Sequence, residues 1–212
     1  MKCMACERAH RLIRKAFAAM LVPPKTPAQW KAVLKEAAPQ GKAAIIDGLA
    51  AELPALCKKY ELHTVNRQAH FLGQLIHESD HLKTTVEYAS GAAYEGRRDL
   101  GNTQKGDGRR FKGRGLIQLT GRANYAAAGK ALKRDFVRDP TQVAKFPHAA
   151  TVSAWFWDRK ALNKHADRDD IQQVTRIING GLRHLDRRAA HTKRAKRALN
   201  GKSTGGVYPE SV

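Results

Sequence analysis

The sequence predicts a mainly α-helical fold of the α+β class, built as one domain with a small β-hairpin beside a cleft. Alanine is plentiful and runs of β-branched residues are scarce, which favours helix over sheet. Apolar residues recur at helical spacing in several segments. One short stretch, 111–125, instead alternates apolar and polar residues as a half-buried strand does.

A chain of 212 residues can bury a sizeable core as a single domain. We expect a basic N-terminal segment over 1–24, a folded domain over 25–200 and a flexible tail over 201–212. The apolar run AFAAMLV in the first segment is too short for a cleavable export signal or a membrane span. Two interpretations of this segment stay open: it forms a short surface helix, or it forms a basic amphipathic helix that touches membranes.

The formal net charge of +20 predicts a polyanionic partner, which can be nucleic acid, anionic lipid or a charged cell-wall polymer. The sequence contains no helix-turn-helix, zinc-finger or aromatic RNA-binding signature, so we expect no specific nucleic-acid partner. Cys3, Cys6 and Cys57 are too few for a disulfide framework, and one CxxC pair does not predict a zinc site. We therefore expect reduced thiols and no metal.

Capping residues and apolar periodicity together define the expected helices. Thr26 can cap a helix over 28–38, and a second helix over 42–59 contains Pro54 as a possible kink. Asp169 or Asp170 can cap a helix that stops at the glycines of Asn179-Gly180-Gly181. Further helices are expected over 125–133, 149–159 and 186–199, with Trp155, Phe156 and Trp157 in the core and a basic face on the last.

The stretch from Asn66 to Tyr88 contains the most informative pattern. Its first part predicts a helix with an apolar stripe formed by Phe71, Leu72, Leu75 and Ile76. Glu78 lies beside this stripe in the expected last turn, where burial and the helix dipole both favour a protonated carboxyl group. Glu87 lies beyond the helix end and is free to fold back towards Glu78. Two carboxyl groups in different environments are the minimal equipment for glycoside hydrolysis.

Two segments that follow predict a binding surface. Glycines interrupt a basic stretch from 90 to 112, which we expect to be a long loop that lines a groove or is simply solvated surface. Strand alternation in FKGRGLIQLTGRANY places Gln118 and Thr120 on one face, suited to hydrogen bonds with sugar hydroxyls or a water. A plain hairpin edge is the alternative interpretation.

Four motifs stand in a recognisable order: HES (77–79), EY (87–88), GRGLIQLTGRANY (113–125) and RIINGGL (176–182). Together they resemble glycoside hydrolase family 19, which contains chitinases and the endolysins of phages that infect Gram-negative bacteria. The resemblance covers roughly residues 60–200 and implies a lysozyme-like catalytic domain within 25–200. The modest length, with no chitinase-like disulfide set and no export signal, looks more like the endolysin branch.

The resemblance implies a role for individual residues. Glu78 corresponds to the general acid, Glu87 to the base that activates water, and Thr120 to the hydroxyl that helps to hold this water. A further set corresponds to positions that contact sugar or order the cleft: Gln118, Asn124, Asn179, Tyr88 and an arginine that is Arg187 or Arg188. Asp80 and His81 depart from the family, because many members have glycines there, and Asp80 competes for a catalytic or electrostatic role.

We therefore expect a monomeric endolysin that hydrolyses the β-1,4 bond between N-acetylmuramic acid and N-acetylglucosamine and lyses its host. An inverting pair requires carboxyl groups roughly 6.5–9.5 Å apart, a spacing that we predict for Glu78 and Glu87. No cofactor is required, and the partners are peptidoglycan glycan strands and an anionic outer-membrane or lipid surface. The resemblance implies residence in the host cytoplasm until a holin permits release to the cell wall. A chitinase, or a polyanion-binding protein without enzymatic activity, is the alternative.

Overall fold

Helices form nearly all of the regular structure in residues 24 and 26–201, which are the residues that the computed structural model describes. The prediction of a mainly α-helical fold is confirmed. The α-helices are α2 (Pro27–Ala37), α3 (Ala43–Lys59), α4 (Val65–Glu78), α5 (Asp107–Arg110), α6 (Arg122–Leu132), α7 (His148–Arg159), α8 (Asn163–Asp167), α9 (Ile171–Asn179) and α10 (Leu185–Leu199). Short 3-10 helices lie between them: η1 (Ala92–Tyr94), η2 (Arg98–Leu100) and η3 (Pro140–Ala144).

The predictions for the N-terminal segment, its cysteine pair and the C-terminal tail fall on residues outside this description. In the described part of the chain, no helix has the length and apolar character needed to cross a membrane.

The capping predictions explain where several helices begin and end. The hydroxyl of Thr26 accepts from the N–H of Gln29, whose side chain accepts in return from the Thr26 N–H, which forms a capping box at the start of α2. Thr64, which the sequence analysis did not name as a cap, caps α4 by accepting one hydrogen bond from the N–H of Arg67. Of the two candidates before α9, Asp170 is the cap, and Gly180 ends this helix in a left-handed conformation.

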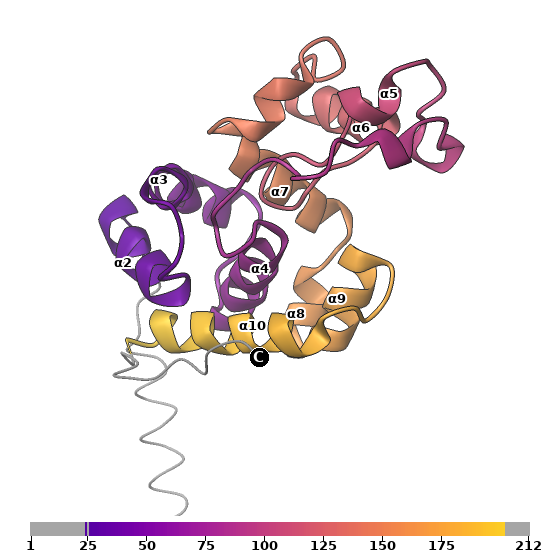
Figure 1. Cartoon of the computed structure of the whole chain (residues 1–212). Helices are drawn as coiled ribbons and strands as arrows, with labels where there is room; N and C mark the ends of the chain where they lie inside the picture. The colour runs from indigo at the N-terminus through magenta and orange to yellow at the C-terminus, as the bar shows by residue number, and fades with distance from the viewer. Residues whose placement is uncertain (1–23, 25, 202–212) are drawn as a thin grey trace, which may run out of the picture.

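Helix α4 lies at the centre of the molecule, and α10 runs across it (Figure 1). Their backbones approach closely at Gly73, where an added Cβ would lie 2.8 Å from the N and Cα atoms of Thr192. Glycine at this point therefore sets how near α10 lies to the end of α4, and with it the place of Glu78.

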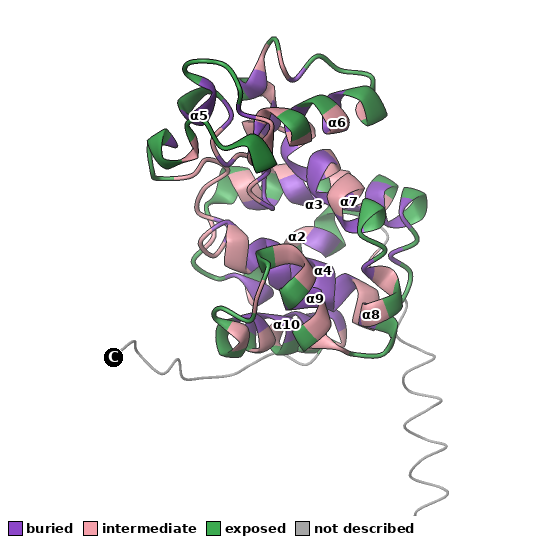
Figure 2. Ribbon diagram, turned by 90° about the vertical axis from the view of Figure 1, so that its right-hand side faces the viewer, coloured by how far each residue is buried: buried purple, intermediate pink, exposed green. Residues whose placement is uncertain are grey.

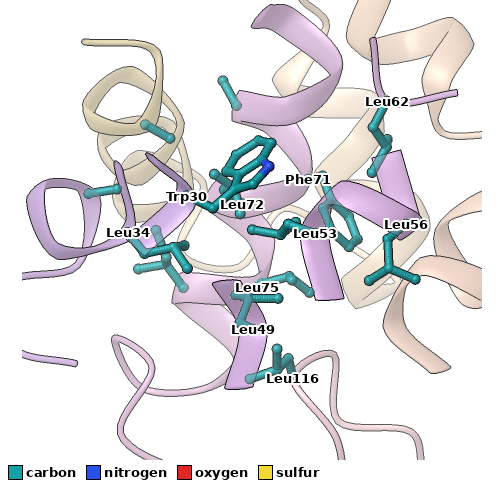
Figure 3. Packing of buried hydrophobic residues seen from close by; sticks show 14 of the residues in the cluster. Trp30, Leu34, Leu49, Leu53, Leu56, Leu62, Phe71, Leu72, Leu75 and Leu116 are labelled. Atoms are coloured by element: carbon teal, nitrogen blue, oxygen red, sulfur yellow. The ribbon is translucent and has the colours of Figure 1, made fainter. Parts of the chain in front are cut away.

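Two hydrophobic clusters hold the helices together. The first unites α2, α3 and α4, and Figure 3 shows Trp30, Leu34, Leu49, Leu53, Phe71, Leu72 and Leu75 packed against one another. The second lies under α6 and α7 and contains Phe111, Leu119, Tyr125, Phe136 and Val152. Trp155 and Phe156 are only partly buried and pack against both clusters, whereas Trp157 is fully buried in the first. Buried residues accordingly occupy both halves of the molecule (Figure 2).

The predicted β-hairpin at 111–125 is wrong. In the described residues this stretch contains only isolated bridges, which pair Arg114 with Val86 and with Leu119. Alternation fails because Leu116, Ile117 and Leu119 are all buried, so apolar side chains are not confined to one face. Gln118 has a left-handed backbone with φ of 57°, which turns the chain instead of extending it.

The expected loop over 90–112 does not stay irregular. It contains η1, η2 and α5, and the buried carboxylate of Asp107 ties it to α6 by accepting two hydrogen bonds from Arg122, at 2.9 and 2.6 Å. Asn102, which is also buried, accepts from the Arg122 N–H and donates to the carbonyl of Tyr94. These contacts fix the position of Tyr94, which matters at the site described next.

Candidate active site

A cavity of about 430 Å³ lies where the end of α4 meets the segment after it, the 113–120 turn and the start of α10. This volume is in the range of small-ligand sites. Six residues predicted from the sequence line it: Glu78, Glu87, Tyr88, Gln118, Thr120 and Arg187. The other two, Asn124 and Asn179, are not among its lining residues; the side chain of Asn124 instead donates to the carbonyl of Thr120 at 2.7 Å.

Glu78 is the last residue of α4, as the sequence predicted, and its side chain is 19% exposed. Oε1 of Glu78 lies 2.6 Å from Nη1 of Arg188 in an ion pair. Arg188 is buried, and its guanidinium also donates to the side chain of Gln74 at 2.5 Å and to the carbonyl of Arg183 at 3.3 Å. The sequence left Arg187 and Arg188 as alternatives, and the structure places Arg188 on Glu78.

Glu87 follows the bridge residue Val86, and its backbone N–H donates to the carbonyl of Gly113 at 2.9 Å. The hydroxyl of Tyr94 donates to its Oε1 at 2.7 Å, and the N–H of Gly113 donates to its Oε2 at 2.9 Å. Burial, followed by the bond to Glu87, raises the pKa of Tyr94 to about 12, so its hydroxyl keeps the proton that it donates. Both donors stabilise negative charge on Glu87 and fix its orientation.

Gly113 lies close to the side chains of both Glu87 and Gln118. An added Cβ would lie 2.7 Å from Oε1 of Gln118 and 3.2 Å from Oε2 of Glu87. Thr120 completes this part of the lining, with its hydroxyl donating to the carbonyl of Gln118 at 3.0 Å. The turn thus brings a carboxylate, an amide and a hydroxyl together, which is a group able to hold a water or a sugar hydroxyl.

The turn after α4 has a backbone conformation that glycine adopts most easily, but it contains no glycine. Asp80, His81 and Leu82 have φ values of 48°, 59° and 61°, so three consecutive residues adopt the left-handed region without glycine. The side chain of Ser79 holds this turn by donating to the carbonyl of Leu75 and accepting from the N–H of Leu82. Asp80 lines the cavity, but its carboxylate accepts from the hydroxyl of Tyr88 at 2.9 Å.

Four imidazole groups to which the sequence analysis gave no role also line the cavity: His77, His81, His184 and His191. The ring of His77 lies 5.5 Å from that of His184 and 6.0 Å from that of His191, which in turn lies 4.8 Å from His81. Burial lowers the pKa of His77 to about 4 and that of His191 to about 3, with nearby positive charges adding to the effect. His184 is the N-cap of α10 and His191 lies within this helix, and their spacing of seven residues in the sequence was the signal that could have pointed to both.

The described residues contain no group of three or more His, Cys, Asp or Glu side chains arranged to hold a metal ion. Cys57 lies buried in the first hydrophobic cluster, and burial raises the pKa of its thiol to about 12. This thiol is therefore part of the core packing.

Comparison with known proteins decides the family. The family model for glycosyl hydrolase family 19, described as chitinase class I, matches residues 44–176, which is more than half of the chain. The chain belongs to glycosyl hydrolase family 19. The match includes Glu78, Glu87 and Thr120 and ends before α10, which supplies Arg187 and Arg188.

Relatives within the family include a glycosyl hydrolase family 19 domain-containing protein of Haemophilus influenzae, 39% identical over 103 residues, covering 48% of this chain and 49% of that protein. The acidic endochitinase of Petunia hybrida is 37% identical over 141 residues, covering 54% of this chain and 51% of the relative. The chain thus spans about half the length of the curated relatives it matches.

Solved structures of family 19 chitinases share the fold. Chitinase C from Streptomyces griseus aligns with a TM-score of 0.66 at 22% identity, covering 84% of this chain and 78% of that one. A class IV chitinase from Zea mays aligns with a TM-score of 0.61 at 20% identity, covering 80% and 91%. These likenesses support the lysozyme-like fold predicted for the domain.

Proposed function

We propose that the protein is a peptidoglycan-degrading glycoside hydrolase that cleaves the β-1,4 bond between N-acetylmuramic acid and N-acetylglucosamine with inversion. One observation carries this proposal. Glu78 and Glu87 line a single cavity, and each carboxyl group is held by different partners, Arg188 in the first case and Tyr94 with Gly113 in the second. Two carboxyl groups held separately in one cleft can perform acid and base roles at one bond.

In this mechanism Glu78 carries a proton on Oε2, the oxygen that is not paired with Arg188, and gives this proton to the glycosidic oxygen as the bond breaks. Arg188 fixes the orientation of Glu78 and stabilises the carboxylate that remains once the proton has left. Glu87 takes a proton from the attacking water, while Tyr94 and the Gly113 N–H stabilise its carboxylate before the transfer. Thr120, which lines the same cavity, helps to hold that water. The predicted spacing of roughly 6.5–9.5 Å between the two carboxyl groups leaves room for this water.

The choice of polymer depends on charge. The net charge of +20 favours peptidoglycan, whose stem peptides are anionic, and the anionic surface of an outer membrane. We propose the corresponding role of a phage endolysin, held in the host cytoplasm until a holin releases it to the cell wall. Chitin is the second candidate, because relatives such as that of Petunia hybrida are named endochitinases.

A digest of purified Gram-negative peptidoglycan tests the proposal. New reducing ends are reduced with borohydride and identified by mass spectrometry, with chitin oligomers digested in parallel. Reduced N-acetylmuramic acid is the expected product. Cleavage of chitin oligomers alone would show that the protein is a chitinase. Cleavage of neither polymer would overturn the proposal that it is a glycoside hydrolase.

A further inference from the structure

The start of α10 forms a cationic wall of the cavity, which we define as His184, Arg187 and His191. The carboxylates that line the cavity do not neutralise it, because each already has a partner. Glu78 pairs with Arg188, and Glu87 accepts from Tyr94 and from the Gly113 N–H. Asp80 accepts from Tyr88 and lies 3.7 Å from Lys83.

Arg187 carries the fixed positive charge of this wall. Arg187 is exposed, and it takes part in none of the ion pairs found in the described part of the chain. Of the two arginines that the sequence left as alternatives, Arg188 pairs with Glu78. Arg187 is thus available to a ligand in the cavity.

The backbone adds positive potential at the same place. His184 is the N-cap of α10, has a left-handed φ of 56° and makes no side-chain capping bond to the first turn. The free N–H groups of a helix start attract anions. Asp186 lies in the same first turn, but it is exposed and is not among the residues that line the cavity.

His191 gives an independent indication that a polar ligand group belongs here. Its side chain lines the cavity, the residue is only 6% exposed, and its Nδ1 atom has no hydrogen-bond partner. An unpaired polar atom at such burial costs free energy, which a ligand oxygen or N–H can recover.

The electrostatic effect on neighbouring groups agrees with this description. Burial is the main cause of the lowered pKa of His77 and of His81, and the positive charge of Arg187 contributes in both cases. Lys83 and Arg194 add to the lowering at His81, and Asp80 opposes it. His77 and His191, with pKa values of about 4 and about 3, are uncharged at neutral pH, and Arg187 supplies a fixed positive charge on this wall.

We propose that the cationic wall is a specificity subsite in which Arg187 binds a carboxylate carried on the lactyl side of a muramic acid residue. This inference rests on the proposed function and narrows it, because uncharged chitin offers no such group. The carboxylate can be that of the lactyl group itself in a bare glycan, or one of the carboxylates of an attached stem peptide. Both sources present the chemistry that a guanidinium binds with paired hydrogen bonds.

Binding of matched ligands tests the subsite without turnover. The protein carries Glu78→Gln throughout, and it is titrated by NMR with the N-acetylglucosaminyl-muramic acid disaccharide, its neutral methyl ester and a muropeptide that bears a stem peptide. Each titration is repeated with Arg187→Ala and with Arg197→Ala. Arg197 is an exposed residue of the same helix outside the cavity, so its replacement makes the same change in net charge.

We expect the free acid or the muropeptide to bind roughly ten-fold more tightly than the ester, with Arg187→Ala removing the difference and Arg197→Ala keeping it. A preference for the free acid identifies the lactyl carboxylate as the source, and a preference for the muropeptide alone identifies the stem peptide. Equal binding of all three ligands would overturn the proposal, as would an equal loss for all three in Arg187→Ala. Failure of the wild-type protein to cleave peptidoglycan would instead refute the proposed function, whatever these affinities are.

Discussion

Replacing Gly73 with alanine perturbs the contact that positions the end of α4, where Glu78 lies. The added Cβ would lie 2.8 Å from the backbone N and Cα atoms of Thr192. Because backbone atoms cannot move aside by changing a rotamer, α4 and α10 must separate to accept the methyl group. Arg188 lies one turn before Thr192 on α10, so the separation also draws it away from Glu78.

The expected change in the free energy of unfolding of Gly73→Ala is the sum of two opposed effects. Alanine stabilises the interior of a helix by about 0.5–1 kcal/mol relative to glycine. Overpacking of a close contact costs about 1–3 kcal/mol. Because the contact here is with backbone, we expect the upper part of this cost and a net loss of about 1–2 kcal/mol, which lowers Tm by roughly 2–4 °C for each kcal/mol.

Urea and thermal unfolding measure this change, and the reducing-end assay measures the accompanying loss of activity. Gly181→Ala is the matched control, since an added Cβ there meets no atom within 4 Å and its stability should change by no more than about 0.5 kcal/mol. A Gly73→Ala protein as stable as wild type, or more stable, would refute the packing argument, because the cost of the backbone contact would then not exceed the gain in helix propensity.

Three further predictions concern the cavity. Tyr94→Phe removes a hydrogen bond to Glu87, and such a bond to a charged group contributes about 1.5–3 kcal/mol, so kcat should fall roughly ten-fold or more, and Tm should fall by roughly 2–4 °C for each kcal/mol of stability lost. Gly113→Ala places a Cβ 3.2 Å from Oε2 of Glu87, which should displace this carboxylate and lower kcat in the same assay. Stability should also depend on pH, because the folded-state pKa values of His77 and His191, about 4 and about 3, lie below the unfolded value of 6.5. The unfolded state then binds more protons, so Tm measured by calorimetry should fall as pH decreases from about 6.5 towards 3–4.

Each of these predictions has an outcome that contradicts it. Full kcat in Tyr94→Phe would mean that the hydroxyl does not position the base. Full activity in Gly113→Ala would show that the turn tolerates a side chain beside Glu87. A His191→Gln variant should show a flatter dependence of Tm on pH, since it removes one depressed group. If Tm of this variant falls with pH as steeply as that of wild type, His191 does not contribute to the pH dependence of stability.

The sequence predicted those parts of the fold that local signals determine. Thr26 and Gly180 fix helix ends through contacts within a few residues, and the stripe that contains Phe71 and Leu75 gives the buried face of α4. Glu78 at the end of that helix followed from the same periodicity. These features need no knowledge of what the chain contacts elsewhere.

The features that the sequence did not predict depend on contacts between distant segments. The alternation around Gln118 predicted a strand, but its neighbours on both sides are buried in different hydrophobic clusters, so the chain turns. Tyr94 reaches Glu87 only because Asn102 and Asp107 anchor its loop to α6. Arg188 was left as one of two alternatives, because only the packing of α10 on α4 decides which arginine faces Glu78.

The most direct test of the central claim is turnover of peptidoglycan by a Glu78→Gln protein whose circular dichroism and Tm match those of wild type. The account predicts a loss of rate of roughly a hundred- to ten-thousand-fold, because the amide cannot supply the proton that the leaving oxygen needs. Glu61→Gln is the control, since this glutamate is 74% exposed and lies outside the cavity, and its activity should equal that of wild type. Substantial residual activity in Glu78→Gln would contradict the assignment of Glu78 as the general acid.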